Sequence, residues 1–160
     1  MSVAIYPGTF DPVTCGHLDI LIRATRLFDK VIIAVAASKE KNPLFSIEER
    51  IKLIEGNIAC EAKVEVTSFD CLLVDFAREK GVQAIVRGLR AVSDFEFEFQ
   101  LTQMNRYLDG SLETIFLMPT QEFFFTSSAI IKQVARYHGN IEKLVPANVV
   151  AALAERYADQ

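Results

Sequence analysis

Short runs of β-branched and aliphatic residues alternate along this chain with longer segments whose apolar residues recur about every 3.6 positions. Such an alternation predicts β-α-β units with right-handed crossovers and a parallel sheet. The short runs are apolar almost throughout, which is typical of strands that helices cover on both faces. The expected strands are Val3–Tyr6, Lys30–Ala37, Lys63–Phe69, Gln83–Arg87 and Glu113–Met118. The expected helices are Gly16–Phe28, Ile47–Ile58, Leu72–Lys80, Val92–Leu108, Ser127–Tyr137 and Pro146–Tyr157.

The length of 160 residues fits one domain. We therefore expect an α/β fold, a single Rossmann-like domain whose five-stranded parallel sheet has helices on both faces and further helices at the C-terminal end. The residues at the helix ends agree with this division. Ser46 and Glu49 form a capping-box pattern before the second helix. Gly139 is expected at the C′ position of the fifth helix, and Pro146 suits the first turn of the last.

The segment Val92–Leu108 carries an ambiguous pattern. Its first residues alternate phenylalanine with aspartate or glutamate, which taken alone indicates a strand. Over the whole segment the apolar residues form two helical stripes without a turn residue between them, so we favour a helix. A helix that is apolar on two faces must bury both, either inside the domain or against another subunit. The stripes are Val92, Phe95 and Phe99 on one face and Phe97, Leu101, Met104 and Leu108 on the other.

Composition argues against several classes of protein. The net charge of −4 disfavours a nucleic-acid surface, which needs clustered positive charge. The longest apolar run, Val31–Ala37, is far shorter than the roughly 18 residues of a membrane span, and no basic leader precedes the first strand, so we expect neither a span nor a signal peptide. Cys15, Cys60 and Cys71 are odd in number and lack a C-x-x-C spacing. They indicate reduced thiols in a cytoplasmic protein.

Ligands of an open parallel sheet bind beyond the carboxyl ends of the strands, so we expect the ligand-binding residues in the loops after the strands. The loop after the first strand contains Gly8, where a ligand can approach the backbone closely. Gly16 and His17 then begin a helix, where free N–H groups and the helix dipole favour a phosphate. A structural histidine at a helix end is the common alternative for His17, and it is the interpretation that we keep for His138.

Cationic and hydroxyl groups follow three other strands. Lys39 and Lys41 come after the second strand, although a solvated loop is the simpler interpretation for Lys39. Arg87 and Arg90 come after the fourth strand, and a guanidinium group can bind phosphate through two parallel hydrogen bonds. The hydroxyls of Thr126–Ser128 could cap the next helix or form a second phosphate site. Together, the four loops predict a cleft for a polyphosphate.

Several common signatures do not occur in the sequence. There is no P-loop motif, no G-x-G-x-x-G fingerprint, no H-E-x-x-H or other metal-ligand cluster and no G-x-S-x-G elbow. The predicted polyphosphate cleft therefore belongs to another class of nucleotide-binding protein.

The segment Gly8–Pro12 followed by Gly16-His17 resembles the T-x-G-H signature of nucleotidyltransferases, a relative of the H-I-G-H motif of class I aminoacyl-tRNA synthetases. The resemblance to bacterial phosphopantetheine adenylyltransferases extends over essentially the whole chain, through Tyr6–Pro12, Arg87–Arg90, Asp94–Glu96, Phe116–Pro119 and Thr126–Ser128. It implies reversible transfer of an adenylyl group from ATP to 4′-phosphopantetheine, which gives dephospho-coenzyme A and pyrophosphate. It also implies Mg²⁺ held mainly by the ATP phosphates, a homohexamer, and coenzyme A as a feedback inhibitor.

The resemblance also implies roles for individual residues. The implied catalytic residues are Thr9, His17, Lys41, Arg90 and Ser127. The implied ATP contacts are Thr9, Phe10, His17, Gly88, Leu89, Arg90, Glu98, Phe123, Phe124, Phe125, Thr126, Ser127, Ser128 and Ala129. The implied phosphopantetheine contacts are Thr9, Lys41, Leu73 and Arg87. Two positions depart from the family pattern, because Phe123 lacks the polar ring atom of Trp or Tyr and Ala129 replaces a frequent third serine.

Elementary chemistry fits the implied reaction. A phosphomonoester is already anionic at pH 7, so its attack on the α-phosphorus needs alignment and charge neutralisation more than a strong base. We therefore expect His17 to donate a hydrogen bond to phosphoryl oxygens. The alternatives are a related transferase with another phosphorylated acceptor, such as nicotinate mononucleotide or glycerol 3-phosphate, and a non-catalytic nucleotide sensor on the same scaffold. The presence of both Thr9 and His17 disfavours the sensor.

Overall fold

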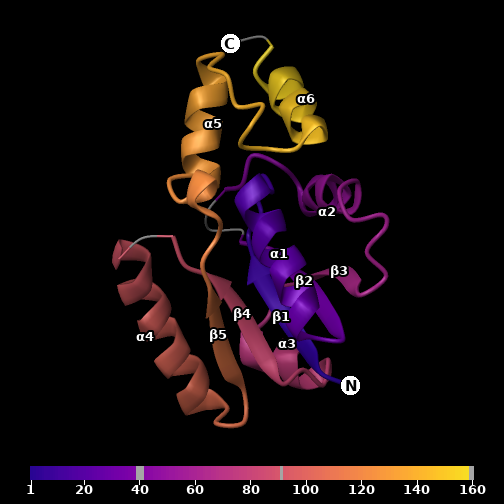
Figure 1. Cartoon of the computed structure of the whole chain (residues 1–160), viewed down its shortest axis with the longest axis vertical. Helices are drawn as coiled ribbons and strands as arrows, with labels where there is room; N and C mark the ends of the chain where they lie inside the picture. The colour runs from indigo at the N-terminus through magenta and orange to yellow at the C-terminus, as the bar shows by residue number, and fades with distance from the viewer. Residues whose placement is uncertain (39–41, 91, 159–160) are drawn as a thin grey trace.

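The computed structural model describes residues 1–38, 42–90 and 92–158, with residues 92 and 93 described by their backbone alone. Five parallel strands form one sheet in the order β3-β2-β1-β4-β5 (Figure 1). The predicted Rossmann-like α/β sheet is confirmed, and the predicted strand ends are correct to within two residues. The strands are β1 (Val3–Gly8), β2 (Lys30–Ala36), β3 (Val64–Phe69), β4 (Ala84–Gly88) and β5 (Glu113–Leu117).

The strand order reverses beside β1. The chain proceeds from β1 outward to β2 and β3 and then returns to place β4 on the other side of β1, where Ile5 pairs with Ile85. Loops that leave β1 and β4 therefore diverge and open a crevice at the carboxyl edge of the sheet. All strands are parallel, so the loops after β2 and β5 reach the same edge.

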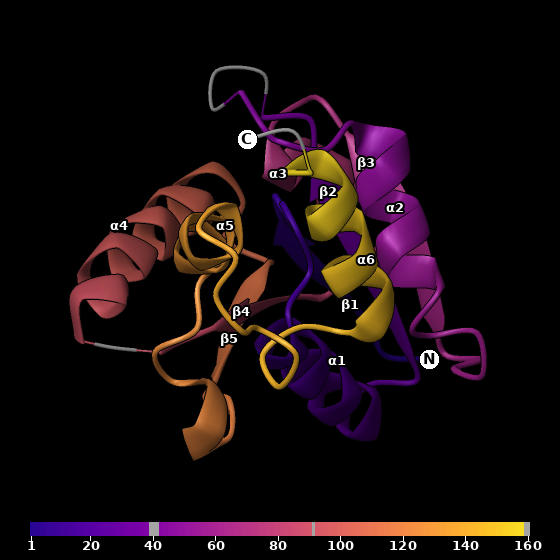
Figure 2. The same cartoon turned by 90° about the horizontal axis from the view of Figure 1, so that it is seen from above.

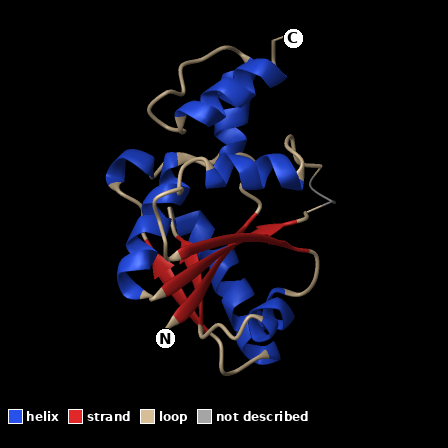
Figure 3. Cartoon of the chain, turned by 90° about the vertical axis from the view of Figure 1, so that its right-hand side faces the viewer, coloured by secondary structure: helices blue, strands red, loops and turns tan. Residues whose placement is uncertain are grey.

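The predicted helices are all present, with ends that differ from the predictions by at most three residues. Figures 2 and 3 show helices on both faces of the twisted sheet. The last two, α5 and α6, pack against each other beyond its carboxyl edge (Figure 1). The helices are α1 (Cys15–Leu27), α2 (Ile47–Glu55), α3 (Leu73–Glu79), α4 (Val92–Leu108), α5 (Ser128–Arg136) and α6 (Ala147–Arg156), and a short 3₁₀ helix, η2, spans Gln121–Phe123.

Side chains of the central strands alternate between two apolar cores. Tyr6 and Ile33 belong to the core shared with α1, α2, α5 and α6, whereas Ile5 and Ile32 belong to the core under α3. This two-residue period explains why the central strands are apolar throughout. The outer strands β3 and β5 are only half-buried, because each has a neighbouring strand on one side alone. Among the described residues, no helix is long and apolar enough to cross a membrane.

The capping box predicted at the start of α2 is present, because the Ser46 side chain accepts a hydrogen bond from the Glu49 N–H and the Glu49 carboxylate accepts one from the Ser46 N–H. The prediction for the end of α5 was wrong by one residue. His138, not Gly139, has the left-handed conformation at C′, with a φ of 58°. The Gly139 N–H then bonds to the Val134 carbonyl at 2.9 Å. Gly139 is required there for space, since a Cβ would lie 2.5 Å from Cγ1 of Val134.

The ambiguous segment is the helix α4, with the predicted ends Val92 and Leu108. An internal location for this helix is wrong for the single chain. α4 stands beside the sheet and contacts α3, at the edge of the molecule (Figure 1). The described apolar side chains of both stripes, from Phe95 to Leu108, remain open to solvent, from 38% at Leu101 to 60% at Phe97.

Candidate active site

A cavity of about 410 Å³ opens at the carboxyl ends of β1 and β4, between the first turns of α1 and α5. Its walls are the loop after β1, the end of β4 with the residues that follow, one side chain of α4, and the segment that leads into α5. The structure brings together twelve of the residues that the sequence singled out. They are Thr9, Phe10, His17, Arg87, Gly88, Arg90, Glu98, Phe123, Thr126, Ser127, Ser128 and Ala129.

His17 lies in the first turn of α1 and forms a capping box with Thr14. The Thr14 N–H donates to Nδ1 of His17 at 3.0 Å, and the His17 N–H donates to the Thr14 hydroxyl oxygen at 3.3 Å. Burial and the charge of Arg90 lower the pKa of His17 to about 4, so the ring is neutral at pH 7. Because Nδ1 accepts a hydrogen bond, the ring proton lies on Nε2. The structure therefore provides a neutral donor at the start of a helix.

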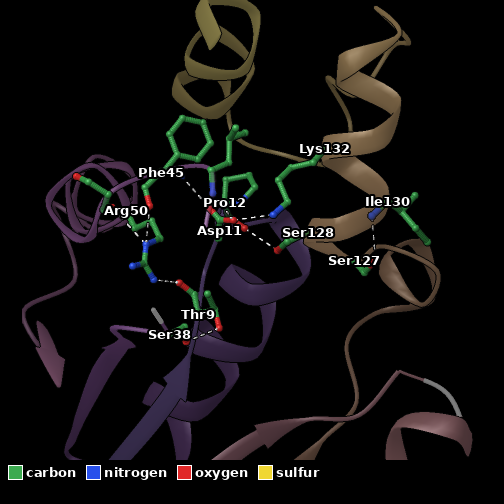
Figure 4. Close-up of polar contacts among 12 residues, drawn as sticks. Thr9, Asp11, Pro12, Ser38, Phe45, Arg50, Ser127, Ser128, Ile130 and Lys132 are labelled. Atoms are coloured by element: carbon green, nitrogen blue, oxygen red, sulfur yellow. Dashed lines mark hydrogen bonds and ion pairs between the residues drawn. The ribbon is translucent and has the colours of Figure 1, made fainter. Parts of the chain in front are cut away.

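The loop between β1 and α1 has a strained backbone at Phe10, with a φ of 49°. The Phe10 ring stands edge-on to the rings of Tyr6 and His17, with centroid distances of 5.4 and 5.1 Å. A Cβ on Gly8 would lie 3.0 Å from the Phe10 ring, so a larger residue would require the ring to shift. Thr9 precedes Phe10, and its hydroxyl is 3.2 Å from the hydroxyl of Ser38 (Figure 4).

Arg87 near the end of β4 and Arg90 just after it both reach the cavity, but carboxylates of α4 already bind them. Arg87 forms two hydrogen bonds of 2.5 and 2.6 Å with Glu98 and donates a third to the Pro7 carbonyl. Arg90 binds Asp94 at 3.0 Å and the Thr126 carbonyl at 2.8 Å. The guanidinium groups thus retain only part of their donors for a ligand, and each positive charge is balanced in the free protein.

Of the two functions that the sequence left open for the hydroxyls at the start of α5, the structure shows the helix cap. The Ser127 hydroxyl oxygen accepts a hydrogen bond from the Ile130 N–H at 3.1 Å, which makes Ser127 the N-cap and leaves its own proton for another acceptor (Figure 4). Ser128 donates to the Pro12 carbonyl at 2.8 Å and so ties α5 to the loop after β1. Phe123 packs close to Gly16, where an added Cβ would lie 3.2 Å from its Cβ.

An ion pair that no sequence motif predicted lies in the cavity wall. Nζ of Lys132 lies 2.6 Å from the carboxylate of Asp11, which also accepts hydrogen bonds from the N–H groups of Leu44 and Phe45 at 2.9 Å (Figure 4). One sequence signal could have found Lys132. It stands four residues after Ser128 and therefore shares the face of α5 that the cap residues present to the cavity.

Some of the expected site residues lie elsewhere. Leu89, Phe124 and Phe125 do not line the cavity, and Phe125 is 90% exposed. Leu73 begins α3 and packs against the core on that face of the sheet. Lys41, together with Lys39, lies outside the residues that the structure describes.

Comparison with known proteins agrees with the geometry of the cavity. A family model described as cytidylyltransferase-like matches residues 5–134. The phosphopantetheine adenylyltransferase of Opitutus terrae is 52% identical over 153 residues, which cover 96% of each chain.

Two solved structures share the fold. A protein assigned as a nicotinate-nucleotide adenylyltransferase from Vibrio parahaemolyticus has a TM-score of 0.73 and 17% identity, over 100% of this chain and 98% of its own. A bifunctional NMN adenylyltransferase/ADP-ribose pyrophosphatase from Francisella tularensis has a TM-score of 0.71 and 19% identity, over 99% of this chain and 52% of its own. At these identities the likeness concerns the fold alone.

Proposed function

Because the chain belongs to the phosphopantetheine adenylyltransferase family of cytidylyltransferase-like proteins, we propose that it catalyses the reversible transfer of an adenylyl group from ATP to 4′-phosphopantetheine in coenzyme A synthesis. A phosphate oxygen of phosphopantetheine forms a bond to the α-phosphorus of ATP, and the bond from that phosphorus to the bridging oxygen breaks. Dephospho-coenzyme A and pyrophosphate are the products, and no bond to the protein is needed.

The hydrogen bond from the Thr14 N–H to Nδ1 of His17 is the single observation that supports this chemistry best, because it assigns the ring proton to Nε2. This Nε2–H lies at the start of α1, where the helix dipole also favours a phosphate. We assign it to the oxygens of the α-phosphoryl group, on which negative charge builds up in the transition state. A group whose pKa is about 4 is a weak base at pH 7, which is acceptable because the attacking phosphate is already ionised.

The remaining residues position the two substrates on either side of that group. Ser127 and the start of α5 face the pyrophosphate end of ATP, and Arg90 approaches the same end from β4. Thr9 lies between the substrates, and Arg87 belongs to the acceptor side. In this assignment a bound phosphate shares Arg87 with Glu98 and Arg90 with Asp94. Lys41 stays a proposed acceptor contact from its family motif alone.

Mg²⁺ suits this site as part of the nucleotide. The carboxylates nearest the cavity, those of Asp11, Asp94 and Glu98, already bind cationic side chains. The described residues contain no group of three or more possible metal ligands. The ATP phosphates would therefore hold most of the coordination of the ion, whose chemistry is to neutralise phosphate charge.

The exposed stripes of α4 support a contact between subunits, and a homohexamer, which the family resemblance implies, is the proposed assembly. Phe97 and Met104 are 60% and 56% exposed on one helix, and burying such side chains contributes about 25 cal/mol per Å². The cytoplasm is the proposed location, because Cys15, Cys60 and Cys71 are free thiols. Coenzyme A, which contains the product, is a proposed inhibitor at the same cavity.

Isotope exchange tests the proposed reaction. Labelled pyrophosphate should enter ATP when dephospho-coenzyme A and Mg²⁺ are present and should not enter ATP when dephospho-coenzyme A is left out. An absence of exchange in the complete mixture would refute the proposed activity. Exchange without dephospho-coenzyme A would instead indicate a covalent adenylyl-enzyme and would refute direct transfer.

A further inference from the structure

Arg50 of α2 is a buried charged residue to which the proposed chemistry gives no role. Its side chain is 1% exposed, and its guanidinium group makes five hydrogen bonds, all to main-chain carbonyl oxygens. Burying a cation is unfavourable unless its donors are satisfied. The five carbonyls around Arg50 satisfy its donors and so make its burial possible.

The five carbonyls belong to three segments that meet at the carboxyl edge of the sheet. Figure 4 shows Arg50 between Thr9 and Phe45. Nη1 donates to Thr9 in the loop after β1 and to Ala36 at the end of β2, both at 2.8 Å. Nη2 donates to Ala37 at 3.4 Å. Nε donates to Phe45 and Ser46 just before α2, at 3.1 and 3.2 Å. Only a planar group with several donors can join these segments at once, and a lysine ammonium cannot.

The bond to Thr9 has a specific consequence for the cavity. The Thr9 carbonyl belongs to the peptide group that precedes Phe10, and the orientation of that group sets the φ of Phe10. Phe10 has a φ of 49°, a left-handed value that costs about 1–3 kcal/mol in a residue with a side chain and persists only where neighbours enforce it. Beyond Phe10 the loop is held by the hydrogen bonds of Asp11 and by Ser128 on Pro12. Before Phe10, the loop is held by the hydrogen bond from Arg50 to the Thr9 carbonyl.

We propose that Arg50 is a positioning residue of the adenylyl transfer, which fixes the Thr9–Phe10 peptide so that the Thr9 side chain and the Phe10 ring take their places in the cavity. The inference rests on the proposed function for its catalytic consequence. Thr9 lies between the two substrates in that proposal, and the Phe10 ring stands against the ring of His17. A shift of the peptide therefore displaces two groups at the reacting phosphorus.

Arg50→Lys and Arg50→Met test the proposal, with Arg78→Met as the control. Lysine keeps the charge and most of the aliphatic chain, so this variant is chosen to fold even where methionine fails. Arg78 is an exposed arginine of α3 that pairs with Asp75 and Asp109, away from the cavity. Calorimetric titration with ATP and Mg²⁺ in the absence of acceptor counts the binding-competent sites, and kcat is then expressed per such site.

We expect kcat per competent site to fall by about 100-fold in Arg50→Lys while KM for ATP changes by less than about threefold, because a displacement near 1 Å at the reacting groups has an effect of that size. Arg78→Met should keep both values. A merely structural role would lower the number of competent sites and the melting temperature but leave kcat per site unchanged. A kcat per site within about threefold of the unmodified protein would overturn the proposal, and so would an equal loss of ATP affinity.

A crystal structure of Arg50→Lys gives a readout that does not depend on activity. The φ of Phe10 should leave the left-handed region, with the Thr9 hydroxyl displaced from that of Ser38. An unchanged Phe10 would refute the positioning role even if turnover fell. If the unmodified protein does not turn over phosphopantetheine, the proposed function fails, and the conformation of Phe10 still decides whether Arg50 positions the loop.

Discussion

Two substitutions of His17 separate its structural function from its proposed catalytic function. The carboxamide oxygen of Asn lies near the position of Nδ1, so His17→Asn keeps an acceptor for the Thr14 N–H but has no donor at Nε2. Gln places its amide group near Nε2, so His17→Gln keeps a donor toward the cavity but leaves the Thr14 N–H without its acceptor.

The expected magnitudes follow from these two hydrogen bonds. Removing one donor to a developing oxyanion lowers kcat by about 10²–10³, or about 3–4 kcal/mol of transition-state stabilisation, and we expect this loss in His17→Asn. Removing a helix cap lowers the free energy of unfolding by about 1 kcal/mol, and we expect this loss in His17→Gln.

Pyrophosphate release measures kcat, calorimetric titration measures ATP affinity, and denaturant unfolding measures stability. His17→Asn should unfold like the unmodified protein, bind ATP within a few-fold of it, and turn over far more slowly. His17→Gln should be less stable and more active than His17→Asn. The reasoning would be refuted by an active His17→Asn, or by losses of ATP affinity and kcat of the same size.

Three further predictions concern pH, the end of α5 and α4. Burial lowers the pKa of His17 to about 4, so its neutral form persists above that pH. The pH profile of turnover should therefore show no inflection from His17 between about pH 5.5 and 8. An inflection near pH 6.5 that is absent from His17→Asn would contradict this prediction. His138→Gly should raise the free energy of unfolding by about 0.5–1 kcal/mol in a thermal melt, because glycine adopts the left-handed conformation without strain; an unchanged or lower melting temperature would count against it. If the proposed hexamer forms through α4, Phe97→Glu should give smaller species than the unmodified protein in light scattering, whereas Glu96→Gln should not. An unchanged particle size for Phe97→Glu would contradict α4 as the contact.

The fold could be predicted because apolar residues recur with different periods in its strands and in its helices. The apolar strands predicted a sheet covered on both faces, and the strand order then placed four loops at one edge. The position of α4 could not be predicted, because the sequence pattern of a helix with two apolar stripes is the same for an internal helix and for one that packs against another subunit. The left-handed C′ residue of α5 is His138, one residue before the predicted Gly139, because Gly139 is needed for space near Val134 rather than for its φ.

Residues of the site were predictable where a motif names them and not where the fold alone brings them together. His17 and Ser127 each lie at a helix start that the sequence reveals. Arg50 lies in the charged sequence Glu48–Lys52, which is typical of a solvated helix face, and its carbonyl partners lie up to 41 residues away in the sequence. The pairing of Arg87 with Glu98 was equally hidden, because both residues have plausible ligand roles when considered separately.

The identity of the acceptor tests the account most directly. The protein, ATP and Mg²⁺ are incubated with 4′-phosphopantetheine, nicotinate mononucleotide or glycerol 3-phosphate, and pyrophosphate and the adenylylated product are both quantified. The account predicts dephospho-coenzyme A and pyrophosphate in equal amounts with phosphopantetheine, and background levels with the other two acceptors. No product with phosphopantetheine, or a faster reaction with either of the others, would contradict it.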